Sequence, residues 1–122
     1  MRLPIEIVPG LHEHKRPIAN LTSEDHCRRS IAKMFAEPEI LSFGKETAYE
    51  AGQRFNRAVQ SLLQRYPDQG LLIVSHGTVM AMFAAIHSNI DPHASWQRIG
   101  LPGALIFTRP PKHLIGNLRP AQ

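Results

Sequence analysis

The sequence predicts an α/β fold, with a layered, mostly parallel sheet and flanking helices, from the order of three segments. A long amphipathic stretch covers residues 47–67, a short apolar run follows at 71–74, and a second apolar stretch covers 79–86. The run at 71–74 is apolar throughout, which is typical of a parallel strand buried on both faces. Helix, strand and helix in this order are the pattern of an α/β layer.

The N-terminal third of the chain adds one strand and one helix to this prediction. Residues 5–8 are rich in β-branched side chains and precede Pro9-Gly10, so we expect a short strand that ends at a turn. Thr22 or Ser23 is expected to cap a helix that ends near Pro38. The apolar side of this helix would consist of Cys27, Ile31, Met34 and Phe35.

The remaining elements follow from capping signals and apolar periodicity. Thr47 and Glu50 have the spacing of a capping box, which predicts a helix from there to Pro67. Residues 79–86 are almost all apolar, so the second helix must be covered nearly all round. We expect a loop or a short helical turn at 89–96, and a strand at 104–108 that pairs with 114–115.

The composition is that of one soluble domain spanning residues 1–122. Hydrophobic residues make up 43% and charged residues 20% of the chain, the ordinary values for a globular protein. The single cysteine, Cys27, rules out an internal disulfide framework and a multi-cysteine metal site, and we expect it to be a small buried hydrophobe. The sequence shows no membrane-spanning apolar stretch and no signal peptide, so we expect a cytoplasmic protein.

The charge balance favours small anionic ligands. The net charge is +4, but the fourteen Lys and Arg residues are scattered and no aromatic stripe runs beside them. A basic surface of this kind attracts small anions, and nucleic-acid binding is the weaker interpretation. We therefore expect a phosphorylated small molecule or phosphate as ligand, with no membrane partner.

The segment Ser75-His76-Gly77-Thr78 is the strongest candidate for chemistry. It lies where the predicted strand at 71–74 gives way to a helix, and a helix N-terminus offers unpaired N–H groups and a partial positive charge to an anion. His76 can donate a hydrogen bond to an oxyanion, Gly77 allows close approach of the backbone, and Ser75 and Thr78 add hydroxyls. The alternative is a core histidine bonded to a backbone carbonyl.

Two further candidates lie just after the first predicted strand. Glu13 would serve as a general acid or base if its surroundings raised its pKa toward neutrality, but the residues alone favour a solvated loop glutamate near Lys15 and Arg16. His12 and His14 form a His-x-His pair that could bind a metal on a strand. No other convincing ligand set accompanies that pair, so we expect no metal site.

Three ordered motifs resemble those of a known family. The first is Leu11-His12-Glu13, and the second is Phe43-Gly44-Lys45-Glu46-Thr47, which precedes a helix with Arg54. The third is the segment from Leu72 to Val79, which contains Ser75-His76-Gly77-Thr78. In this order they resemble the motifs of the phosphoglycerate-mutase-like branch of the histidine phosphatase superfamily. The resemblance extends over residues 5–108.

The resemblance implies a role for two of the candidates. Glu13 would match the general acid that protonates the leaving oxygen, and His76 the histidine that binds the transferring phosphoryl group. Gly77 would give its backbone N–H to the same oxyanion. Chemistry in the family passes through a phosphohistidine, and it requires neither a metal nor another cofactor.

The sequence also departs from the family pattern. Family members begin with a strand that ends in Arg-His-Gly and supplies the nucleophile, and a later Ser-x-x-x-Arg-Ala segment brings a second arginine. Neither is present, because the one His-Gly pair is His76-Gly77. The chain therefore resembles the C-terminal portion of such an enzyme, a truncated domain with an incomplete phosphoglycerate-mutase-like fold.

This departure leads to two expectations about function. The first is a phosphomonoester phosphatase, or a phosphate-binding remnant, without the nucleophile segment and with little activity alone. The alternative is a noncatalytic dimerisation or partner-binding module on the same scaffold. The absent strand would leave residues 71–74 with an unpaired edge, so we expect a rearranged sheet, a homo-oligomer or a completing chain.

Overall fold

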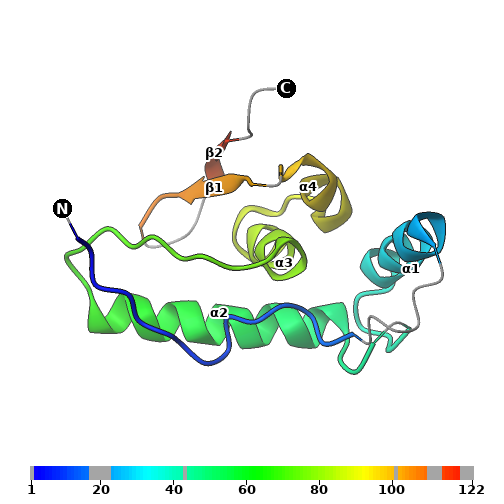
Figure 1. Ribbon diagram of the computed structural model, residues 1–122, viewed down its shortest axis with the longest axis horizontal. Helices are drawn as coiled ribbons and strands as arrows, with labels where there is room; N and C mark the ends of the chain where they lie inside the picture. Colours follow the sequence, from blue (N-terminus) through cyan, green and yellow to red (C-terminus); the bar gives the residue numbers. More distant parts are fainter. Residues whose placement is uncertain (1, 17–22, 43, 101, 110–113, 119–122) are drawn as a thin grey trace.

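The computed structural model describes residues 2–16, 23–42, 44–100, 102–109 and 114–118. In this part of the chain the helices are α1 (Glu24–Ala36), α2 (Ala48–Arg65), α3 (Gly77–Ser88) and α4 (Pro92–Arg98), and the strands are β1 (Ala104–Phe107) and β2 (Leu114–Leu118). The longest helix, α2, forms the base, and α3 packs on it between α2 and a layer made of α4 and the β1–β2 hairpin (Figure 1). Helix α1 lies at one end of this stack and contacts α4.

The capping signals in the sequence mark the starts of two helices correctly. Ser23 is the N-cap of α1 and its hydroxyl accepts a hydrogen bond from the His26 N–H; Thr22 lies outside the described residues. At α2 the Thr47 side chain accepts from the Glu50 N–H, and the Glu50 carboxylate accepts from the Thr47 N–H, which completes the predicted capping box. Both helices are thus fixed at their N-termini by local sequence.

Helix α3 is covered on most sides, as its apolar sequence predicts. Its buried residues contribute to two core clusters that join α3 to α2. In one of these, the centroid of the Phe83 ring lies 5.6 Å from that of Phe55 and 5.0 Å from that of Phe107, both edge-on, so Phe83 joins α2, α3 and β1 through two aromatic contacts. The buried residues of α3 are Thr78, Val79, Ala81, Met82, Phe83 and Ala84.

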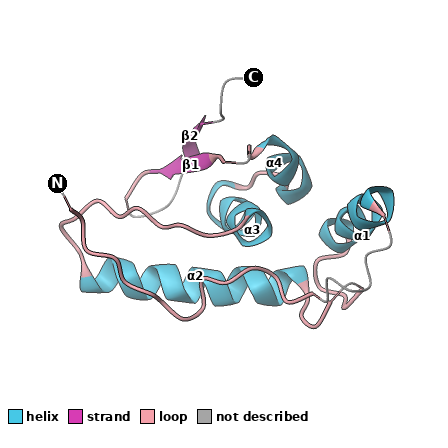
Figure 2. Ribbon diagram, in the orientation of Figure 1, coloured by secondary structure: helices cyan, strands magenta, loops and turns pink. Residues whose placement is uncertain are grey.

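The C-terminal hairpin is confirmed, whereas the parallel sheet is not. β1 and β2 pair antiparallel, with Ala104 opposite Leu118 and Phe107 opposite Leu114. The predicted strands at 5–8 and 71–74 are extended chain without ladder partners in the part of the protein that the structure describes (Figure 2). A strand is defined by pairing, and apolar β-branched sequence cannot by itself supply a neighbour. Of the predicted α/β fold, the structure therefore confirms the helices and an antiparallel hairpin, but not a parallel sheet.

The segment at 71–76 keeps the alternation of a strand even though it is unpaired. Leu71, Ile73 and Ser75 are half-buried, and Ile73 packs on the core cluster of α2 and α3. Leu72 and Val74 point the other way and are each 85% exposed. The continuous apolar run thus has one covered face and one uncovered face, and the prediction of burial on both faces is wrong here.

Among the described residues, no helix combines the length and apolar character needed to cross a bilayer.

Candidate functional site

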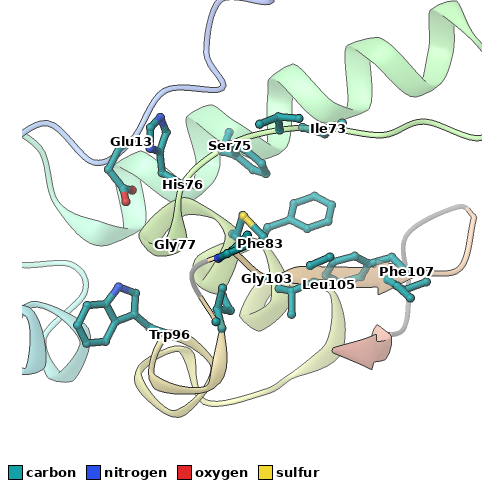
Figure 3. Close-up of a pocket in the computed structure, with 18 of the residues that line it drawn as sticks. Glu13, Ile73, Ser75, His76, Gly77, Phe83, Trp96, Gly103, Leu105 and Phe107 are labelled. Carbon is teal, nitrogen blue, oxygen red and sulfur yellow. The ribbon is translucent and has the colours of Figure 1, made fainter. Parts of the chain in front are cut away.

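The candidate site lies at the N-terminus of α3, where the extended segment 71–76 enters the helix. His76 is the N-cap residue, with φ −127° and ψ 160°, and its side chain makes no capping hydrogen bond. The residue is exposed, so the interpretation of His76 as a buried core histidine does not hold. Figure 3 shows His76 and Glu13 at the same end of the cavity that both residues line.

Glu13 supplies the cap that His76 does not. Its Oε2 accepts a hydrogen bond from the Thr78 N–H and its Oε1 accepts one from the Val79 N–H, both at 3.2 Å. A carboxylate in this position satisfies two of the helix's unpaired donors and interacts favourably with the positive end of the helix dipole. The interpretation of Glu13 as a solvated loop glutamate is therefore wrong, because its carboxylate is bonded to the first turn of α3 and its side chain is 28% exposed.

The two hydroxyls of the predicted site are bonded to other parts of the protein. Thr78 is buried, and its Oγ1 accepts from Nη2 of Arg16 at 2.5 Å. The same Arg16 nitrogen lies 3.7 Å from Oε2 of Glu13. The Ser75 hydroxyl donates to the Leu11 carbonyl at 2.6 Å. Arg16 thus brings a positive charge to the helix end, which sequence analysis did not assign to it.

Arg54, on α2, holds the backbone that carries Glu13. Its Nη1 donates to the carbonyls of Gly10, at 2.7 Å, and His12, at 2.8 Å, and its Nη2 donates to the carbonyl of Glu13 at 3.2 Å. Nη2 also forms an ion pair with Oε1 of Glu46 at 2.6 Å. One guanidinium therefore connects α2, residues 10–13 and the segment before α2.

The charges around Arg54 shift the pKa values of two nearby side chains, Glu46 and His12. Burial by itself raises the pKa of Glu46, but the hydrogen bonds from Arg54 and from the Lys15 N–H outweigh it and hold the pKa below its ordinary value. Loss of hydration and the positive charges of Arg54 and Lys15 lower the pKa of His12, and His76 adds to this effect.

The His-x-His pair is divided between two environments. His14 is 2% exposed, and its Nε2 lies 2.6 Å from the Glu46 carbonyl oxygen, whereas His12 is exposed. Burial lowers the pKa of His14, and the charge of Arg16 lowers it further against the opposing effect of the Glu46 carbonyl. Over the residues that the structure describes, no three His, Cys, Asp or Glu side chains gather as metal ligands.

A cavity of about 1680 Å³ opens beside this helix end. His76 and Gly77 line it at one end, Phe83 and Trp96 line its floor and side, and Leu105 of β1 lies across from the segment 71–76 (Figure 3). A Cβ at Gly77 would lie 3.4 Å from the Trp96 ring, so the backbone runs close to this indole. The site is therefore accessible from a wide, mainly apolar space.

The local sequence gave no direct signal for Arg16 or Glu46 as members of this cluster. Glu46 and Arg54 are eight residues apart, and the capping box at Thr47 predicts that a helix begins between them. That spacing places Glu46 just before α2 and Arg54 in its second turn, and it is the one local indication that the two side chains lie close together. The resemblance named Arg54 only as part of a helix, without a role.

The comparisons with known proteins agree with these motifs. The model of the histidine phosphatase superfamily (branch 1) matches residues 1–108, a range that contains Glu13, Arg54 and His76. The searches of curated proteins and of solved structures gave no match. Because the family model covers most of its length, the chain belongs to the histidine phosphatase superfamily.

Proposed function

We propose that the chain binds the phosphate group of a phosphorylated small molecule at the N-terminus of α3, with His76 and Gly77 as its main ligands. The observation that carries this proposal is the exposed imidazole of His76 on an N-cap where its side chain makes no capping bond. A protonated imidazole and a helix N-terminus both attract a dianion. Ser75 and Thr78 flank the site, and their present bonds to Leu11 and Arg16 support its shape.

Glu13 is the proposed general acid of this site. It lies on the first turn of the helix that His76 caps, and in its protonated form its carboxyl would give a proton to the oxygen that leaves a phosphoryl group. In the structure the carboxylate is bonded to the amides of Thr78 and Val79, so a bound phosphate meets a competing negative charge. Arg16, 3.7 Å from Glu13, offsets part of this repulsion.

We propose that this site has little or no phosphatase activity in the chain alone. Phosphoryl transfer in the family that the chain belongs to uses a nucleophilic histidine in Arg-His-Gly, and the sequence holds no such tripeptide. Without that nucleophile the phosphohistidine intermediate cannot form, so the two-step transfer that it makes possible is lost.

A phosphate titration followed by amide and imidazole NMR resonances tests the proposal. Phosphate and vanadate should shift the resonances of His76 and Gly77, and His76→Ala should abolish saturable binding. His26→Ala is the matched control, because His26 is an exposed histidine in the first turn of another helix. Binding that survives His76→Ala would contradict the proposed site. Robust turnover of a phosphomonoester that His76→Ala abolishes would contradict the proposed lack of activity.

A second candidate function is a noncatalytic dimerisation or partner-binding module. The observation that favours it is the apolar face of Leu72 and Val74, each 85% exposed on an extended segment with no ladder partner among the described residues. An unpaired edge with apolar side chains is a template for strand addition by another chain. A second copy of this chain and a completing chain are both compatible with such an edge.

Light scattering separates the two candidates when it is combined with the phosphate titration. A stable dimer that becomes a monomer in Leu72→Lys, together with no phosphate shift at His76, would favour the module. Leu41→Lys is the control, because Leu41 is also a large exposed hydrophobe, at 60%, but lies in the loop before α2. A monomer with saturable phosphate binding would favour the phosphate site.

A further inference from the structure

We propose that Arg54, held in place by Glu46, is the positioning residue that sets the Glu13 carboxylate on the first turn of α3. The inference deepens the proposed function, on which it rests for the role of Glu13 as the general acid of the site. The contact between Glu13 and α3 joins residues 65 and 66 positions apart in sequence. Such a contact requires the chain around Glu13 to be fixed, and Arg54 bonds to three backbone carbonyls of that chain.

The guanidinium of Arg54 holds one end of the segment that carries Glu13. Its three bonds to the carbonyls of Gly10, His12 and Glu13 turn these oxygens toward α2. A planar guanidinium offers five N–H donors in a fixed arrangement, which an ammonium group cannot reproduce. The backbone can come this close because Gly10 has φ +97°, and a Cβ there would lie 3.0 Å from the Cβ of Ala58.

Glu46 holds the other end of the same segment. Its Oε1 accepts from the Lys15 N–H at 3.0 Å, and its backbone carbonyl meets Nε2 of His14 at 2.6 Å. The Lys45 N–H also donates to the Lys15 carbonyl at 2.7 Å. Arg54 is bonded to the backbone of the residues up to Glu13, and Glu46 is bonded to the residues just after it. Glu13 therefore lies between two points at which the chain is bonded to the Arg54–Glu46 ion pair.

The consequence is that the direction of the Glu13 side chain depends on Arg54, although Arg54 donates to its backbone carbonyl and not to its carboxylate. With the main chain fixed on both sides, the carboxylate reaches the amides of Thr78 and Val79, in the first turn of the helix that His76 caps. A catalytic or binding carboxylate must be held to within a fraction of an ångström by its supporting residues. Arg54 supplies that support from a different helix.

The test compares amide NMR resonances in variants of the whole chain at neutral pH. Glu13→Gln removes the carboxylate from Thr78 and Val79 and defines the displacement of their amide resonances. Arg54→Lys keeps the positive charge but loses the fork of donors. It should displace the same two resonances in the same direction and to a comparable extent. Arg57→Lys is the matched control, because Arg57 is an exposed arginine of the same helix and should leave both resonances in place.

The double variant makes the result specific to positioning. If Arg54 acts through Glu13, then Arg54→Lys adds no displacement at Thr78 and Val79 in a Glu13→Gln background. A purely structural role would lower stability without this dependence. Additive displacements, or unchanged resonances in Arg54→Lys, would overturn the proposal.

A second variant keeps the test decisive if Arg54→Lys fails to fold. Glu46→Gln leaves Arg54 in the chain but removes the charge that anchors it, and should displace the same resonances partway. Unchanged resonances in a folded Glu46→Gln chain would then overturn the proposal. Absence of phosphate binding in the wild-type chain would end the proposed function, whereas the amide resonances would still decide the role of Arg54.

Discussion

Arg54 and Glu46 form an ion pair that is almost closed to solvent: Nη2 of Arg54 lies 2.6 Å from Oε1 of Glu46, and the two side chains are 14% and 9% exposed. In contrast, Arg28 and Glu24 on α1 pair at 2.5 Å with side-chain exposures of 68% and 77%. The difference in burial decides which pair matters for stability, because water screens the exposed pair.

Loss of the buried partner should be costly. Glu46→Ala is expected to lower the free energy of unfolding by about 3 kcal/mol, because it leaves the Arg54 charge partly buried and the Lys15 N–H without its acceptor. Arg28→Ala, the matched control on α1, should change it by no more than about 0.5 kcal/mol. Urea unfolding followed by circular dichroism measures both. Equal effects of the two variants would refute the assignment of Arg54 and Glu46 as the stabilising pair.

The capping box of α2 gives a second prediction. Thr47→Ala removes the side-chain acceptor of the Glu50 N–H and should cost about 1 kcal/mol of stability. Thr47→Ser keeps a hydroxyl at the same place and should recover most of that loss. The midpoints of urea denaturation for the two variants provide the measurement. A serine variant as unstable as the alanine variant would point to packing of the threonine methyl group instead.

The pH dependence of stability follows from His14. Its pKa is lowered in the folded chain by burial first and then by Arg16, so the unfolded chain binds a proton more readily. The stabilisation is fully present above the unfolded value of about 6.5 and is lost as the pH falls through the lower folded value. The pKa of Glu46 is also lowered in the folded state, which favours its ionised form. Protonation of Glu46 at more acidic pH should therefore lower the stability of the folded chain further.

Unfolding midpoints in urea should therefore decrease from about pH 7.5 to about pH 5, near and below the ordinary pKa of histidine. His14→Gln should be less stable than the wild type at neutral pH but should show a smaller decrease over this range. His12→Gln should also flatten the curve, because the pKa of His12 is lowered by loss of hydration and by Arg54 and Lys15. A midpoint that stays constant over this range in the wild-type chain would contradict the assignment.

The close packing of α2 on α3 at Gly52 leads to a fourth prediction. A Cβ at Gly52 would lie 2.9 Å from the Cβ of Met82, so Gly52→Ala should destabilise the chain by about 1–3 kcal/mol in spite of the better helix propensity of alanine. Gly70→Ala is the control, because no atom lies within 4 Å of the added Cβ. Thermal unfolding of the two variants should show a lower midpoint for Gly52→Ala alone. A stabilised Gly52→Ala chain would show that the two helices can move apart freely.

The elements that the sequence predicted correctly are those whose causes are local. Ser23 caps α1, Thr47 and Glu50 cap α2, and the apolar residues of α3 are buried, all as their spacing indicates. The hairpin of β1 and β2 also depends on two neighbouring apolar runs. The prediction of strands at 5–8 and 71–74 failed, because a strand needs a paired neighbour. The residues of one segment do not specify whether a distant segment will pair with it.

The sequence by itself determined the positions of α1, α2 and α3 and the caps of α1 and α2, because hydrophobic periodicity and capping residues act over a few residues. It also indicated Ser75-His76-Gly77-Thr78 as the candidate site. Only the tertiary structure decided that Glu13 caps α3 and that Arg54 holds Glu13 there. These contacts join residues 41 to 66 positions apart. Their existence depends on how α2, α3 and the loop at 10–16 pack together, which no local pattern specifies.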